Sequence, residues 1–171
     1  DQTNLTAYAK AVLTETGAHQ LHDILPPTAL QISHALVDSH PASKATTAFM
    51  RKELGRPGVQ VLASQQACIP PMTTVMRTDV VLVKAIDGNS FMVGQIWLLT
   101  SAESAGDFAL LSSWELETRE KDEIAVWRMK DGPTLIHLEL VLAPVAWAEI
   151  SPGRARTLIP FHYRGFHAAD R

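Results

Sequence analysis

Two apolar segments separated by a short polar turn constrain the fold more than any other part of this sequence. Residues 80–86 form a run rich in β-branched side chains, which is typical of a strand. Asp87-Gly88-Asn89 follows, and these residue types favour the positive φ angles of tight β-turns. Residues 91–99 supply a second apolar run that can return beside the first. The pattern predicts an antiparallel β-hairpin.

Strand signals continue along the rest of the chain. Further strands are predicted over residues 59–62, 108–116, 124–129, 135–142, 145–150 and 157–159. The segments between them are polar or contain proline and glycine, and residues 100–107 read as a polar loop. Because no convincing helix separates the strands, antiparallel pairing in a small barrel or sandwich is favoured.

Helical spacing of apolar residues is confined to the first part of the chain. It predicts helices over residues 3–16, 27–39 and 43–54. Ser43 can cap the third helix, and Gly55 can end it. We therefore expect an α+β fold with N-terminal helices packed on an antiparallel, SH3-like small β-barrel. The expected regions are helical over 1–56 and barrel over 57–171, packed as one unit because so short a helical region is marginal alone.

Composition limits the class of protein. Of 171 residues, 46% are hydrophobic and 19% are charged, as in folded domains. The net charge of −3 excludes a generally basic nucleic-acid-binding protein but allows a local basic strip. The single cysteine, Cys68, cannot form an internal disulfide, which favours an intracellular location, with the nucleus as one option. No apolar run reaches the ~20 residues of a membrane helix, so no membrane partner is expected.

Candidate metal ligands are present but poorly spaced. His19 and His22 lie three residues apart and would share one face of a helix. With Asp23, or with the distant His34 or His40, they would offer zinc ligands. Their spacing matches no closed zinc motif, and a solvated turn between helices explains them better. No metal site is predicted.

The other sets of residues that could form a catalytic site are no better supported. Ser33, His34 and Asp38 are triad residue types, but adjacent residues on a helix point in different directions. Cys68 has no nearby basic residue in the sequence and is interpreted as a small core hydrophobe. Glycine-rich phosphate-binding loops do not occur. We therefore predict no catalytic residues and no cofactor.

Charge segregation and aromatic residues favour recognition. Residues 115–123 are mainly acidic, whereas residues 154–167 contain arginine and histidine but no acid. The four tryptophans fall on separate predicted strands, where they either fill a core or line an open face. The candidate binding residues are Arg154, Arg156, His162, Tyr163, Arg164, Trp97 and Trp114.

Part of the chain resembles the bromo-adjacent-homology (BAH) domains. Residues 79–84, 87–88 and 92–96 are similar to the opening hairpin of that family, and residues 110–118 resemble its strand with a Trp followed by an acidic stretch. The aromatic-Arg-Pro segment usual after that Trp is missing, and the N-terminal helices have no counterpart. The resemblance implies a chromatin-associated protein-interaction module built on a distorted small barrel.

The leading hypothesis is a non-enzymatic module that binds a protein, or alternatively a nucleic acid, through the barrel face and the basic C-terminal segment. One alternative is a small-barrel enzyme in which histidines and carboxylates meet in a pocket. The candidates for that pocket are His137, His162, Glu139 and Glu149. Another alternative is a structural subunit of a larger assembly. The sequence determines neither the partner nor the oligomeric state.

Overall fold

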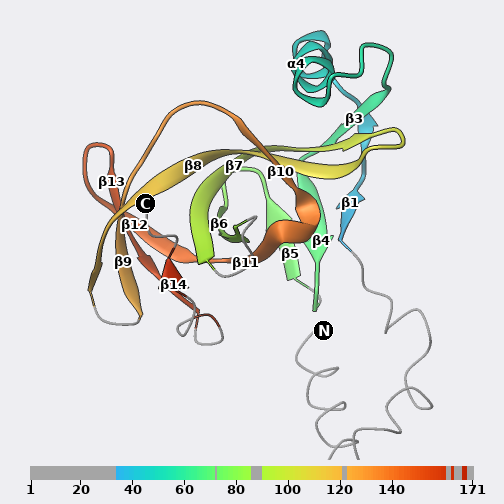
Figure 1. Ribbon diagram of the computed structural model, residues 1–171. Coiled ribbons are helices and arrows are strands. Elements are labelled where there is room, and N and C mark those ends of the chain that lie inside the picture. Colours follow the sequence, from blue (N-terminus) through green and yellow to red (C-terminus); the bar gives the residue numbers. More distant parts are fainter. Residues whose placement is uncertain are drawn as a thin grey trace, which may run out of the picture.

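The computed structural model describes residues 34–71, 73–85, 90–120, 123–160, Tyr163 and the backbone of 167–168 (Figure 1). This part of the chain is mostly strand, and α4 (Lys44–Leu54) is the only α-helix within it. The helix predicted over residues 3–16 and the histidine-rich segment after it lie outside the described residues. The predicted α+β fold is wrong, because the described chain forms largely antiparallel, open sheets rather than helices on a closed SH3-like barrel.

The predicted hairpin is confirmed. β6 (Val80–Lys84) pairs antiparallel with β7 (Ser90–Ala102), from Val80 opposite Gln95 to Lys84 opposite Phe91. Residues 80–83 are buried on both faces of the sheet, which explains why this segment is continuously apolar. The turn predicted at residues 87–89 lies outside the described residues.

β7 and its next partner, β8 (Gly106–Glu120), are longer than predicted. They meet at a turn of residues 103–105, so most of the predicted loop over 100–107 is strand. The polar residues of this segment predicted a loop, but Thr100 shows that a polar residue here can lie in a buried strand. It is fully buried, and its hydroxyl lies 3.5 Å from the sulfur of Met50. One bulge-type shift of register, between Ile96 and Leu98, bends the pair.

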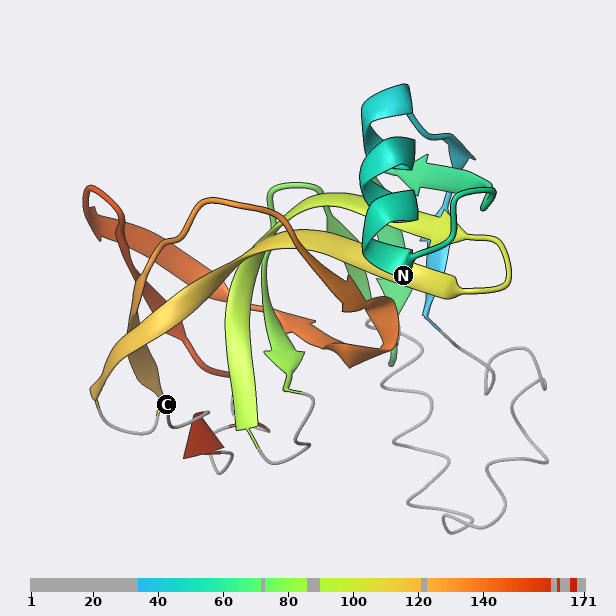
Figure 2. The ribbon, with the colours of Figure 1, turned by 45° about the horizontal axis from the view of Figure 1, so that its top comes forward.

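The larger sheet has the principal order β11-β6-β7-β8-β9-β13-β12 and is strongly curled (Figures 1 and 2). Its strands beyond β8 and β6 are β9 (Ile124–Arg128), β11 (Val141–Pro144), β12 (Ala146–Ser151) and β13 (Arg154–Leu158). The two end strands, β11 and β12, are successive segments joined at Val145. The N–H of Val145 donates to the carbonyl oxygen of Val80 at 2.9 Å. No ladder joins β11 to β12, so the sheet stays open.

The strand predicted over residues 135–142 is interrupted. Its first half is β10 (Thr134–His137), which pairs with β8, whereas β11 pairs with β6. A 3-10 helix, η2 (Leu138–Leu140), joins the two and buries Leu138 completely. η2 therefore links a strand paired with β8 to a strand paired with β6, and β8 and β6 are the two neighbours of β7 in the sheet.

A smaller sheet has the order β1-β4-β5, with β1 (Ala35–Val37), β4 (Gln66–Ile69) and β5 (Thr73–Met76). The helix predicted over residues 27–39 is wrong in its described part, because β1 is a strand that places Ala35 opposite Cys68. Pairing with a distant strand overrides the local helical spacing. β4 and β5 were not predicted.

Three short strands complete the sheets. β2 (His40–Pro41) pairs with β3 (Val61–Ser64), and β3 pairs with β7, so this segment continues the larger sheet. The strand predicted at residues 59–62 therefore exists but begins two residues later. β14 (His167–Ala168) runs parallel to the start of β7.

The helix predicted over residues 43–54 is confirmed as α4. The hydroxyl of Ser43 accepts the N–H of Thr46 at 3.2 Å, and Gly55 ends the helix with a left-handed φ of 63°. Met50 is fully buried in a cluster with Phe108. α4 thus packs over the end of β7 and β8, where Figure 2 shows it.

Two other core clusters lie along the long strands. One joins the smaller sheet to the larger, with Ile69 and Val75 packed near Leu99 and Leu111. The other contains Trp114 and Trp127 from β8 and β9, together with residues of β6, β7 and β13. No described helix has the length and apolar character needed to cross a membrane.

At Gly94, β7 lies too close to β8 to leave room for a side chain. A Cβ atom there would lie 2.5 Å from Leu111 Cδ1 and 2.7 Å from the carbonyl oxygen of Ser112. We expect Gly94→Ala to lower the free energy of unfolding by about 1–3 kcal/mol, because the backbone oxygen cannot move aside without disturbing the ladder. Urea denaturation measures the change.

The matched control is Gly58→Ala. A Cβ at Gly58 meets no atom within 4 Å and the residue has no positive φ, so this variant should stay within about 1 kcal/mol of the original chain. Equal stabilities for the two variants would contradict the close approach at Gly94.

Candidate functional site

Alternation along β13 separates core from surface. Ala155 and Thr157 are buried, whereas Arg154, Arg156 and Leu158 are exposed. Residues directly opposite one another on paired strands share a face of the sheet. The exposed residues of β13 therefore lie on the same side as their partners on β9 and β12. We call this side of β8, β9, β13 and β12 the outer face.

Glu117 of β8 is the centre of an ion-pair network on the outer face. Its carboxylate lies 3.3 Å from Arg128 Nε and 2.7 Å from Arg154 Nη2. The Glu117 side chain is only 18% exposed, although both arginines reach solvent. The hydrogen bond from Arg154, with the charge of Arg128 beside it, holds the pKa of Glu117 below its usual value.

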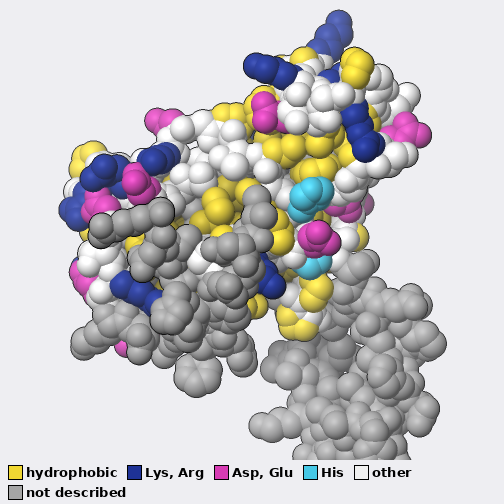
Figure 3. Space-filling view, in the orientation of Figure 1, with side chains coloured by type: hydrophobic (Ala, Val, Ile, Leu, Met, Phe, Trp, Pro, Cys, Tyr) yellow, Lys and Arg dark blue, Asp and Glu magenta, His cyan; other side chains and the backbone are white. Residues whose placement is uncertain are grey.

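Two further ion pairs extend this network. Lys130 Nζ lies 2.9 Å from Glu115, and its hydrogen bond lowers the pKa of that carboxyl. Arg156 Nη2 lies 3.2 Å from Glu120. Figure 3 shows the charged side chains gathered at the left end of the molecule, over β9 and β13. The acidic and basic segments of the sequence thus neutralise each other across the sheet.

The other half of the outer face is apolar. Ala146, Leu158 and Ile124 lie opposite one another on β12, β13 and β9. Leu158 is 48% exposed and Ile150 is 42% exposed, both unusual for large apolar side chains. With Ala148 they border a hollow of about 320 Å³. We call these residues the apolar strip: Ile124, Ala146, Ala148, Ile150 and Leu158.

The four tryptophans divide between core and surface. Trp114 and Trp127 are buried, and the indole N–H of Trp127 donates to the hydroxyl of Thr157 at 2.7 Å. Trp147 is 39% exposed and packs edge-on against Trp114, with ring centroids 5.5 Å apart. Trp97 is 42% exposed on β7. Of the two predicted binding tryptophans, Trp97 is at the surface and Trp114 is in the core.

The remaining predicted binding residues lie near the C-terminus. Tyr163 is half-buried and packs against the core cluster of Trp114 and Trp127. His162 and Arg164 lie outside the described residues. Arg154 and Arg156 are exposed but ion-paired, as described above.

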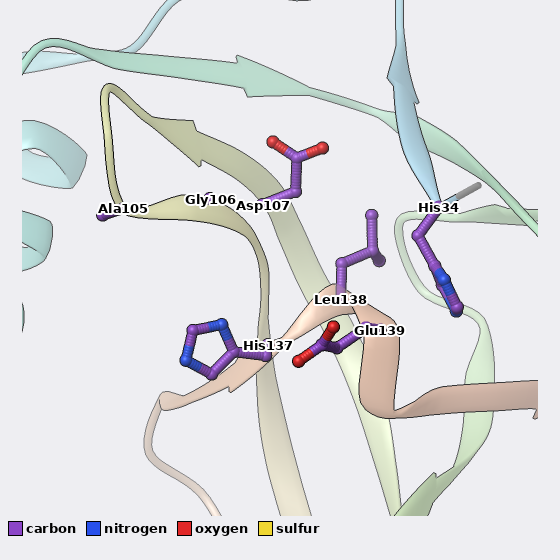
Figure 4. A pocket seen from close by; sticks show the side chains of 7 residues that line it. All are labelled: His34, Ala105, Gly106, Asp107, His137, Leu138 and Glu139. Atoms are coloured by element: carbon purple, nitrogen blue, oxygen red, sulfur yellow. The ribbon is translucent and has the colours of Figure 1, made fainter.

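A cavity of about 410 Å³ lies where β1, β8, β10 and η2 meet. Its polar lining consists of His34, Asp107, His137 and Glu139, and Leu138 and Ala105 add apolar atoms. Figure 4 shows His34 and His137 on opposite sides, with Glu139 between them and Asp107 across the opening. The structure thus brings together His137 and Glu139, two of the residues proposed for an enzymatic pocket.

The other two residues of that hypothesis are not placed in the cavity. Glu149 accepts the N–H of Gly153 at 3.1 Å in the turn between β12 and β13, and His162 is outside the described residues. The ring of His34 is held by the carbonyl oxygen of Val141 at 3.2 Å, not by Asp38. Cys68 is half-buried on β4. Among the described residues, no three histidine, cysteine, aspartate or glutamate side chains are grouped closely enough to hold a metal ion.

Sequence reasoning missed the apolar strip and half of the cavity. The strip combines residues from three strands and depends on the register between them, which local patterns do not fix. The sequence gives one indication of the strip: Arg154, Arg156 and Leu158 alternate with small or polar residues along β13, as on a strand with one exposed face. His34 and Asp107 come together only through the position of β1, which the sequence did not predict.

The ion pairs of Glu117 make stability depend on pH. Because folding lowers the pKa of this carboxyl, its contribution is complete above the usual value of 4.5 and is lost as the pH falls through the lowered folded-state pKa. We expect Glu117→Gln to destabilise the chain at pH 7 and to flatten the loss of stability below pH 4.5. Urea denaturation at a series of pH values tests this.

Glu103→Gln serves as the control, since Glu103 is exposed and its side chain makes no ion pair with a described residue. It should follow the original chain at every pH. If Glu117→Gln also followed it, the network would contribute nothing to stability.

The outer face combines an ion-paired half with an apolar half, and the cavity combines two histidines with two carboxylates. Neither a protein-family model nor a curated protein matches this sequence.

Proposed function

We propose that this chain is a non-enzymatic binding module that recognises a protein partner through the outer face. The observation that carries the proposal is the apolar strip, in which Ile150 and Leu158 remain more than 40% exposed beside a hollow. Contiguous exposed apolar surface costs free energy in water, and it commonly marks a contact surface.

The form of the strip supports a protein contact. Its large residues come from three neighbouring strands, so a rigid sheet holds them in fixed positions. A preorganised apolar surface loses little conformational entropy on binding. A hollow bordered by Ile124 and Leu158 can receive an apolar side chain of the partner, which is how the central residues of protein interfaces bind.

The ion pairs favour a protein partner over a nucleic acid. Arg154 and Arg156 are each bound to a carboxylate, as are Arg128 and Lys130. A phosphate would have to replace Glu117 or Glu120 at these cations. Nucleic-acid affinity depends on cations that are free to displace counterions, and this face offers three carboxylates beside its four cations.

The charged half then serves as the polar rim of the contact. Arg156 and Glu120 stand directly beside the apolar strip, since Leu158 and Ile124 are the next outward-facing residues. Rim charges affect specificity and the rate of association more than affinity. The chromatin partner implied by the resemblance to BAH domains stays a prediction.

Leu158→Asp tests the proposal. With the full chain as bait in lysate of its own source, a charge at the centre of the apolar strip should reduce retention of a specific partner at least ~10-fold, as expected for a central interface residue. Quantitative mass spectrometry of the retained proteins measures the effect.

Met76→Asp is the matched control, because Met76 is 52% exposed on a strand of the smaller sheet. It should retain the partner as well as the original chain does. A photo-crosslinking residue at position 150 should attach to the same partner. A partner lost equally from both variants, or one that never crosslinks to position 150, would exclude the outer face as the contact surface.

A further inference from the structure

We propose that the cavity between β1, β8, β10 and η2 binds an organic cation, a guanidinium or ammonium group. Its lining residues are assigned no role in the proposed function, because they lie away from the outer face. The volume of about 410 Å³ is within the range of small-ligand sites. The side chains around it decide which ligand it suits.

The cavity is rich in hydrogen-bond acceptors. Asp107 is half-buried and Glu139 is exposed, and neither carboxylate has an ion pair or hydrogen bond with another described residue. This contrasts with Glu117, whose charge is satisfied by two arginines. Among the residues that the structure describes, no lysine or arginine lines the cavity. Two unpaired carboxylates therefore set its charge, which complements a cation.

The two histidines place hydrogen-bonding ring nitrogens on opposite sides of the cavity (Figure 4). A carbonyl oxygen can only accept a hydrogen bond, so His34 Nε2 donates to Val141, and Nδ1 of the neutral ring is an acceptor. His137 packs against Phe108, with ring centroids 4.6 Å apart and the ring planes tilted by 36°. The two histidine rings lie at opposite sides of the opening (Figure 4).

Separated acceptors suit an extended organic cation better than a metal ion. In the part of the chain that the structure describes, no three of these groups converge as metal ligands must. A guanidinium group instead carries five N–H donors in one plane and can bond carboxylates and imidazole nitrogens on different sides. The half-buried Ala105 offers the aliphatic stem of such a ligand an apolar contact.

Arg56 is a cation that contacts the turn next to the cavity. Arg56 donates to the carbonyl oxygen of Ser104 at 3.1 Å, in the turn that precedes Gly106. No ion pair joins Arg56 to Asp107, so that carboxylate is left for a ligand.

The test is titration of the full ¹⁵N-labelled chain with N-acetyl-argininamide, followed by NMR. We expect saturable shifts of the backbone N–H signals of residues 105–107 and 137–139. N-acetyl-citrullinamide has nearly the same shape without the charge and should produce none. Equal shifts with the two probes would overturn the proposal, and this comparison needs no variant.

Substitutions then locate the charge. Asp107→Asn combined with Glu139→Gln should weaken binding of N-acetyl-argininamide at least ~10-fold, whereas Glu103→Gln, on the same turn as Ala105 but outside the cavity, should leave it unchanged. Full binding by the double variant would refute the assignment. So would stoichiometric Zn²⁺ binding that shifts the same signals and excludes the arginine probe.

Two more probes identify the source of the cation. Agmatine carries the guanidinium group as a free small molecule, and an Ac-Gly-Arg-Gly-amide peptide carries it on a protein-like backbone. Tighter binding of agmatine assigns the site to a small-molecule amine. Tighter binding of the peptide assigns it to an arginine side chain of a protein.

Discussion

The alternation of side chains along β7 is the constraint on which the rest of the structure depends. This one strand contributes Phe91 and Val93 to the cluster around Trp127, Ile96 and Leu99 to the cluster beneath the smaller sheet, and Ala102 to the cluster under α4. It also pairs with β3, β6, β8 and β14. Because the side-chain period of a strand is two, a slip of one residue in β7 would misplace all three clusters together.

Local patterns identified the elements whose residues interact mainly with near neighbours. The hairpin of β6 and β7 was predicted because a buried strand, a turn and a second strand follow one another. α4 was predicted because Ser43 and Gly55 specify its ends through their own backbone. β1 and β4 were not predicted, since neither carries a strong strand pattern and each is fixed by the other across some thirty residues.

The predictions about the surface were limited by the same physics. Residues 115–123 and 154–167 were recognised as acidic and basic, but local patterns treat them as two separate surfaces. β9 and β13 place Glu117 beside Arg154, 37 residues along the chain, and cancel most of that contrast. The predicted fold class was wrong for a related reason. The number and spacing of strands indicate antiparallel sheets, but they do not show whether the two end strands of a sheet pair to close a barrel.

The junction at Val145 has a mechanical consequence. The residues before it hold β6, and the residues after it form the exposed margin of the outer face. A molecule that grips β12 therefore pulls on a chain anchored by the Val145 hydrogen bond to Val80, deep in the sheet. Force applied to β12 is therefore opposed by its ladder with β13 and, through the backbone, by the hydrogen bond from Val145 to Val80.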